Sequence, residues 1–160
     1  MERLASSLAI ASTGLLAGAF AYAFFTVVPT FYEVPLEVHF IYRDALMKHN
    51  GAYVQIVMGL SILTPTWWAY SSRGVAGVRF LAMAASLLSL TSFLVTRFGN
   101  IPINRLIKTW SAIAPPPDYQ ELLARWLIFH DIRTAAAVTR GSAIRTHSLS
   151  KIRRRDAPEP

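Results

Sequence analysis

The 160-residue sequence contains no cysteine, which removes several kinds of site at once. Without thiols, the chain has no disulfide bond, no cysteine nucleophile, no cysteine-bound zinc and no iron–sulfur cluster. Acidic residues are also scarce, since 9 Asp and Glu stand against 16 Lys and Arg, for a formal net charge of +7. Hydrophobic residues make up 53% of the chain, which is too much for an ordinary soluble domain.

The basic residues are distributed unevenly along the chain. Seven of them lie in the last 28 residues, from Arg133 to the C-terminus. Basic clusters next to apolar segments commonly set the orientation of a membrane protein or contact anionic lipid. No segment resembles a nucleic-acid-reading helix or a base-stacking surface. The composition therefore indicates membrane lipid as a partner and excludes nucleic acid.

Charged residues are absent from three long stretches, which are residues 4–28, 52–70 and 80–96. A helix of about 20 apolar residues crosses the hydrocarbon core of a bilayer, so each stretch is predicted to be a transmembrane helix. A fourth helix is predicted at about 119–138 from apolar residues at helical spacing. We therefore expect residues 1–138 to form an all-α integral membrane helical bundle of the four-helix type.

The predicted fourth helix is short for a membrane span. Arg140 closely follows its apolar part, and residues 139–160 form a basic, proline-ended tail that we expect to be disordered. If this helix crosses the membrane, the positive-inside rule places both termini in the cytoplasm. If it does not, the N-terminus lies outside. In either case we expect a multi-pass protein of the cell membrane with a cytoplasmic tail.

Residues 29–51 are polar and lie between the first two predicted spans. Their apolar members are spaced so that an amphipathic helix could lie at the membrane interface. Glu33, Glu37, His39 and His49 are the metal-ligating residue types in this segment. They match no known metal-binding spacing, so we expect no metal site here.

The segment RFGNIPINRLIKTW, residues 97–110, follows the third predicted span. In one interpretation, Gly99 and Asn100 turn the chain out of the membrane, Asn100 caps a short helix, and the cations contact lipid headgroups. That interpretation does not require Asn104, because asparagine is a poor helix former.

A second interpretation is a functional site, which the predicted fourth helix suggests. Trp126, His130 and Arg133 are spaced i, i+4 and i+7, so they share one helix face. An arginine stabilises an anion, and a histidine exchanges a proton near neutral pH. The three residues together suit a flat, weakly acidic aromatic ligand. The residues alone leave the structural and the functional interpretation open.

The segments FGNIPINRLIKTW and PPPDYQELLARWLIFHDIRTAAAV together resemble the small integral membrane family that includes the fungal anthrone oxygenases. Its bacterial members were long known only as a domain of unknown function. The resemblance covers residues 1 to about 138 and ends where the basic tail replaces an apolar helix end. The matching residues are Gly99, Asn100, Pro102, Asn104, Trp110, Asp118, Trp126, Phe129, His130, Arg133 and Thr134.

The resemblance implies a four-helix transmembrane bundle and a cofactor-independent oxidation by O₂. Its characterised members convert an anthrone into an anthraquinone, so the implied substrate is a hydrophobic polycyclic aromatic or quinol-type molecule. His130 is then the candidate base that removes the acidic C10 proton. At the other matching positions, the chemistry of the reaction suggests Asn100, Asn104 and Arg133 as the residues that hold the oxyanion, and Trp110 and Trp126 as those that stack on the rings. The resemblance implies no cofactor and no metal.

Two further expectations concern packing. Asn100 and Asn104 are expected to meet the face formed by Trp126, His130 and Arg133, with residues 29–51 as the other wall of a pocket. The alternative function is a non-catalytic membrane subunit that binds a partner. Gly14 and Gly18 form a GxxxG pair, which lets another helix approach closely and indicates a homo-oligomer or a partner helix.

Overall fold

The computed structural model describes the backbone of residues 1–110 and 114–155, and the side chains of residues 1–110 and 114–139. No strand occurs in these ranges, which confirms the all-α class. Two of the helical segments, η1 and η2, are π-helical. The elements are α1 (Glu2–Tyr22), η1 (Ala23–Val27), α2 (Val28–Glu33), α3 (Leu36–Ser71), α4 (Ala76–Val95), η2 (Thr96–Asn100), α5 (Ile101–Ile107) and α6 (Tyr119–Arg155).

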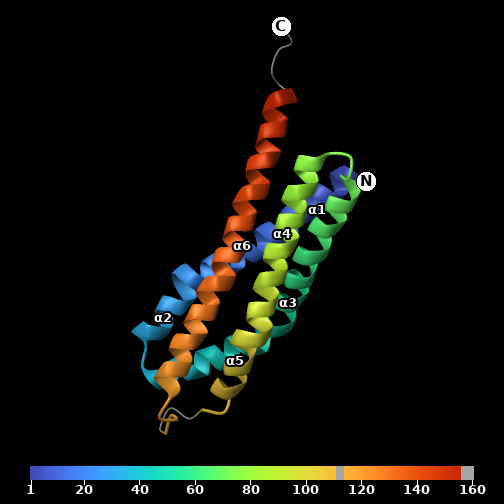
Figure 1. Ribbon diagram of the computed structural model, residues 1–160. Coiled ribbons are helices and arrows are strands. Elements are labelled where there is room, and N and C mark those ends of the chain that lie inside the picture. The colour runs from blue at the N-terminus through green and yellow to red at the C-terminus, as the bar shows by residue number, and fades with distance from the viewer. Residues whose placement is uncertain (111–113, 156–160) are drawn as a thin grey trace.

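Four long helices form the bundle. α1 and α4 each pack against both α3 and α6, which closes a ring of four neighbours. Figure 1 shows the N-terminus and the α3–α4 connection at one end of the bundle, with α6 projecting beyond that end. The elbow between α2 and α3, the short helix α5 and the start of α6 lie at the opposite end (Figure 1). We call this second end the elbow end.

Two continuous helices, Glu2–Glu33 and Ala76–Ile107, are long and apolar enough to cross a membrane. They contain the predicted spans at 4–28 and 80–96. Their outward surfaces are apolar, with large exposed side chains such as Leu15, Phe80 and Leu87. The predicted span at 52–70 lies within α3, which is not among the helices in the described part of the chain with that length and composition.

The two π-helical segments explain why both apolar helices continue through a proline. Pro29 and Pro102 each stand two residues after such a segment. The ring of a proline clashes with the carbonyl group four residues earlier, which belongs to Phe25 or Phe98 here. Both of these carbonyls lie in the widened turns of η1 and η2, which accommodate the ring. The chain therefore continues as a helix through Gly99, and the turn that the first interpretation placed there does not occur.

Two predicted boundaries differ from the structure. Residues 29–51 do not form a separate interfacial helix, because α3 begins at Leu36 and runs unbroken to Ser71. A single glycine inside a helix costs only about 1 kcal/mol, so Gly51 does not interrupt it. α6 also continues past the predicted end at 138 and reaches Arg155, since no proline occurs between Tyr119 and Pro158. Residues 156–160 of the predicted tail lie outside the described residues.

The bundle interior changes in character from one end to the other. At the end with the N-terminus, small residues such as Ala5, Ala9, Ala82 and Ala85 let the helices approach closely. Towards the elbow end the buried cluster is built from larger residues, which are Val28, Ile103, Ile107, Leu123 and Trp126. The polar residues of the predicted site lie beside this second cluster.

Candidate functional site

Trp126 is the residue around which the predicted site assembles. The Asn100 side-chain amide, from η2, donates a hydrogen bond to the Trp126 carbonyl oxygen at 3.0 Å. The Trp126 indole N–H donates to Oδ1 of Asn104, from α5, at 2.8 Å. Both asparagines of residues 99–104, which we call the GNIPIN segment, therefore bind α6. Asn100 makes no side-chain capping bond at the start of α5. This outcome contradicts the interpretation of Asn100 as a helix cap.

Gly99 lets η2 come close to α6. A Cβ atom built on Gly99 would lie 2.5 Å from the Phe129 ring, which is inside van der Waals contact. Any larger residue would therefore push the two helices apart. The glycine is needed for this close approach rather than for a turn.

His130 is completely buried, and aromatic rings surround it. Its ring stacks on Trp126, with centroids 5.1 Å apart and planes inclined by 10°. Phe24 also stacks on it at 6.2 Å, and Phe20 meets it edge-on at 6.5 Å. These contacts come from α1, η1 and α6, so His130 lies inside the bundle.

Arg133 fixes the tautomer of His130. Its Nε and Nη2 lie 3.2 Å and 2.9 Å from the His130 Nδ1. A guanidinium group only donates hydrogen bonds, so Nδ1 must accept and the proton of the neutral ring is assigned to Nε2. That Nε2 is buried and has no hydrogen-bond partner. His130 therefore presents an unused N–H donor to the bundle interior.

Arg133 itself is held by further contacts inside the bundle. Its Nη1 donates to the Thr96 hydroxyl at 3.4 Å. Its guanidinium carbon lies 4.7 Å from the Phe20 ring centre and 5.6 Å from that of Trp126. Contacts of a cation with an aromatic face are favourable and leave the charge in place.

Arg43 joins this site, although the sequence analysis did not predict it. It lies on α3 with only 3% of its surface exposed. Its guanidinium carbon stands 4.1 Å from the Trp126 ring centre and 5.0 Å from that of Phe31. Its Nε and Nη1 have no hydrogen-bond partner. We call Arg43, His130 and Arg133, together with the rings around them, the cationic cluster.

The cationic cluster has no counter-ion among the side chains that the structure describes. An ion pair does occur outside the cluster, on the surface of α3, where Lys48 lies 2.7 Å from Asp44. Both arginines therefore lack a carboxylate partner among the described side chains. A charge inside a protein is costly unless a partner compensates it.

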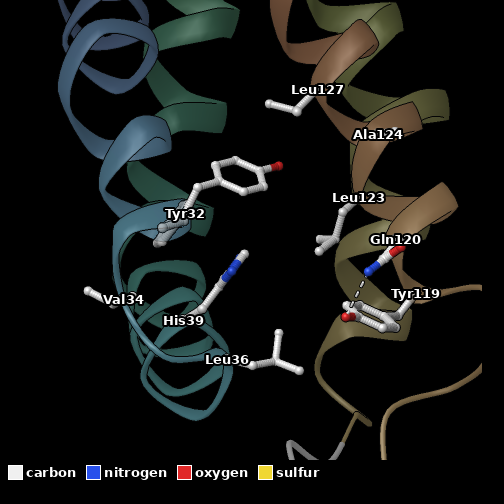
Figure 2. A pocket seen from close by; sticks show the side chains of 10 residues that line it. Tyr32, Val34, Leu36, His39, Tyr119, Gln120, Leu123, Ala124 and Leu127 are labelled. Atoms are coloured by element: carbon white, nitrogen blue, oxygen red, sulfur yellow. Dashed lines mark hydrogen bonds between the residues drawn. The ribbon is translucent and has the colours of Figure 1, made fainter.

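A cleft of about 400 Å³ opens at the elbow end, beside the cationic cluster. It lies between the α2–α3 elbow and the first turns of α6, as Figure 2 shows. Tyr32 and His39 point into it from the elbow, and Leu123 and Tyr119 face them from α6 (Figure 2). The cleft walls are Phe31, Tyr32, Val34, Leu36, His39, Tyr119, Gln120, Leu123, Ala124 and Leu127.

His39 is the polar, titratable residue that lies deepest in the cleft wall. It is 4% exposed and stacks on Phe31 with centroids 4.9 Å apart and planes inclined by 5°. Its Nε2 has no hydrogen-bond partner. Burial and the neighbouring Arg43 lower the pKa of His39 to about 4, so the ring is neutral at physiological pH.

The structure brings most of the predicted site residues together. Asn100, Asn104, His130 and Arg133 all contact Trp126 or a neighbour of it. Trp110 does not join them in this way, because its ring meets Phe40 edge-on at 5.6 Å. It packs against the outside of the same apolar cluster.

Two other predictions concern residues away from this site. A Cβ atom added to Gly14 or Gly18 would meet nothing within 4 Å, so neither glycine is used for helix packing within the chain. In the described residues no group of three or more His, Cys, Asp or Glu side chains is arranged to hold a metal ion. Glu33, Glu37 and His49 are exposed, and only His39 of that set is buried.

Comparison with known proteins gives one match. A family model described as anthrone oxygenase matches residues 45–142, which is more than half of the chain. No curated protein and no solved structure matches significantly. The matched range contains the GNIPIN segment and the Trp126, His130 and Arg133 face, which are the parts that assemble around Trp126. The chain therefore belongs to the anthrone oxygenase family.

Proposed function

We propose that this protein is a membrane-embedded, cofactor-independent oxygenase. It oxidises a hydrophobic polycyclic aromatic or quinol-type substrate with O₂. The observation that carries the proposal is the cationic cluster, in which Arg43 and Arg133 lie among aromatic rings and no carboxylate of the described side chains pairs with them.

The electrostatics of the cluster favour an aromatic anion as ligand. Two guanidinium groups in a poorly solvated interior are stabilised when a negative charge enters beside them. The rings of Phe20, Phe31 and Trp126 pack against the guanidinium groups and make their surroundings apolar and aromatic. A planar molecule with a delocalised negative charge meets both conditions. The anion formed when an anthrone loses its C10 proton is of this kind.

The oxidation is balanced without any other reactant. The substrate carbon loses two hydrogen atoms and gains one oxygen atom from O₂. The second oxygen atom leaves with the two hydrogen atoms as water. Loss of the C10 proton gives an electron-rich carbanion that can react with O₂ directly, and we take its formation as the step that the site accelerates. A site that stabilises the anion therefore accelerates the whole reaction.

The contacts support a role for each polar residue of the cluster. Arg43 and Arg133 stabilise the oxyanion by charge, and the free Nε2–H of His130 donates a hydrogen bond to it. This role of His130 differs from the base predicted from the sequence, because Arg133 occupies its Nδ1. Asn100 and Asn104 hold Trp126 in place and so position the aromatic wall. Trp110 supports that wall from outside.

The membrane suits such a substrate. Polycyclic aromatics dissolve in lipid, and the apolar outer surfaces of α1 and α4 are in keeping with a position in the bilayer. We propose an integral, multi-pass protein of the cell membrane with its basic C-terminal segment in the cytoplasm. Its partners are then membrane lipid and the aromatic substrate.

The test is oxidation of an anthrone by the purified protein in detergent micelles, with O₂ present and metals chelated. We expect quinone to form faster than in protein-free buffer. Arg43→Gln, which removes one charged oxyanion donor, should lower turnover about 10²–10³-fold. Quinone formation by the folded wild-type protein at the spontaneous rate would rule out the proposed activity.

A non-catalytic membrane subunit is the second candidate function. The open space around Gly14 and Gly18 favours it, because a helix from another chain could pack there. Cross-linking in native membranes tests this candidate. A homo-oligomer or a fixed partner that is lost when both glycines are changed to leucine would support it.

A further inference from the structure

We propose that the substrate lies in the cleft at the elbow end and that His39, rather than His130, accepts its proton. This inference rests on the proposed function and assigns the base that the reaction requires. Nothing in the family resemblance singles out His39, which precedes the matched residues 45–142.

The hydrogen bonds of His130 prevent it from accepting a proton. A neutral histidine accepts a proton only at the ring nitrogen that carries none. In His130 this is Nδ1, which already accepts from Nε and Nη2 of Arg133. His130 is therefore suited to donate a hydrogen bond and unsuited to remove a proton.

The other histidines differ in their position relative to the cleft. Side chains are described for three of them, which are His39, His49 and His130. His49 is exposed on α3, away from the cleft wall. His39 lines the cleft, points into it in Figure 2, and has a buried Nε2 without a partner. His39 is thus the histidine that meets the cleft with a ring nitrogen still available.

The shape of the proposed substrate separates the base from the oxyanion donors. In an anthrone the acidic carbon and the carbonyl oxygen lie on opposite edges of the central ring. The base and the oxyanion donors must therefore stand on opposite sides of that ring. His130 and Arg133 touch each other, so they cannot serve both edges. His39 and Arg43 are four residues apart on α3, an advance of about 6 Å along the helix, so their side chains can reach different edges of a flat ring system.

The cleft and the cationic cluster share wall residues. The Phe31 ring carries His39 stacked at 4.9 Å and lies 5.0 Å from the Arg43 guanidinium carbon. Leu123 lines the cleft and packs in the same buried cluster as Trp126. A flat molecule in the cleft can therefore direct one edge at His39 and the other towards the cationic cluster. The volume of about 400 Å³ is within the usual range of small-molecule sites.

The proposed steps conserve atoms and electrons. The substrate C–H proton moves to a His39 ring nitrogen, and the electron pair remains on the ring system as the oxyanion form. The carbanion carbon bonds to O₂ and gives a peroxide anion, which takes the proton back from His39. The hydroperoxide then loses its O–OH bond and the second C–H proton together. The products are the quinone carbonyl and water.

The experiment isolates the proton step by leaving out O₂. The full-length protein is incubated anaerobically with anthrone in D₂O, and deuterium incorporation at C10 is followed by mass spectrometry. We expect the wild-type protein to exchange the proton faster than buffer does. His39→Gln should lower the catalysed exchange about 10²–10⁴-fold, which is the usual contribution of a positioned base. The matched control is His49→Gln, on the same helix and exposed, which should exchange like the wild type.

Two more variants separate a base from a structural residue. His39→Ala should regain exchange when imidazole is added, because the small base can fill the vacated place in the cleft. His130→Gln keeps an N–H donor and should lower exchange less than His39→Gln does.

The outcomes are distinguishable. A loss below about tenfold in His39→Gln, no rescue of His39→Ala by imidazole, or a larger loss in His130→Gln would each overturn the assignment of His39. If the wild-type protein is active with O₂ in these cases, the proposed function still holds. If the wild type produces no quinone above the spontaneous rate, both proposals fall.

Discussion

At the scale of single residues, Arg43 shows how function and stability oppose each other in this bundle. Its guanidinium group is buried, is unpaired by any carboxylate in the described part of the chain, and has two nitrogen atoms without partners. Replacing a buried ion pair with apolar residues of similar volume is often neutral or stabilising, by up to about 4 kcal/mol, and Arg43 lacks even the carboxylate partner that such a pair has among the described side chains. The proposed binding of an anionic substrate would offset this cost.

We therefore predict that Arg43→Met raises the thermal unfolding midpoint in detergent while it lowers anthrone oxidation. Methionine keeps much of the side-chain volume against Phe31 and Trp126 but removes the charge. The control is Lys48→Met on the same helix, which removes only an exposed ion pair and should change stability by less than about 1 kcal/mol. A less stable Arg43→Met protein would mean that Arg43 serves the fold instead.

The sequence predicted one part of the site and missed another for a physical reason. Trp126, His130 and Arg133 share a helix face by their spacing alone, so any helix through them brings them together. His39 and Arg43 are also on one face of their helix. Their neighbours depend on the elbow at Pro35, which turns the start of α3 against α6, and no local pattern reports that direction.

At the scale of elements, the close contact of η2 with α6 determines how the site is held. We predict that Gly99→Ala destabilises the protein by about 1–3 kcal/mol, because the added methyl group would lie 2.5 Å from the Phe129 ring. Thermal unfolding in detergent measures this. Gly18→Ala is the matched control, since it meets nothing within 4 Å and removes a helix-interior glycine. It should be neutral or slightly stabilising, and equal losses in both variants would contradict the packing argument.

The hydrogen bond between Trp126 and Asn104 is the second link between these elements. Trp126→Phe keeps a ring on His130 but removes the indole N–H that donates to Asn104 at 2.8 Å. We predict a coupling of about 1 kcal/mol between Trp126→Phe and Asn104→Ala in a double-mutant cycle of unfolding free energies. Additive losses would show that the two side chains do not depend on each other.

Helix identities were easier to predict than helix ends. The charge-free runs correctly located α1 and α4, because hydrophobic length is a local property of the sequence. The starts and ends were wrong where a supposed breaker is tolerated. Pro102 continues a helix because η2 widens the turn before it, and Gly51 sits inside α3. Local propensity is weak against the packing of a long helix in a bundle.

At the scale of the whole molecule, the helix arrangement connects the direction of the chain with its charge. The N-terminus, the α3–α4 connection and the C-terminal part of α6 lie at the same end (Figure 1). Arg3, Arg73 and Arg79 belong to this end, with the basic residues that follow Thr139. The elbow end carries Arg97, Arg105 and Lys108 as well as Glu33, Glu37 and Asp118, so it has cations too but is less basic than the other end. From the larger number of basic residues at the first end we propose, by the positive-inside rule, that this end lies in the cytoplasm and the cleft on the other side.

The absence of cysteine makes this orientation directly testable. Single cysteines at Glu37 and Gly74, both exposed and at opposite ends, can be labelled with a membrane-impermeant maleimide. We predict labelling of Glu37→Cys in intact cells, and of Gly74→Cys only after the membrane is opened. The reverse pattern would place the cleft in the cytoplasm, so that substrate would enter from the inner side. Labelling of both positions in intact cells would show that α3 does not cross the membrane. Because α6 runs between the same two ends of the bundle, it would then not cross the membrane either.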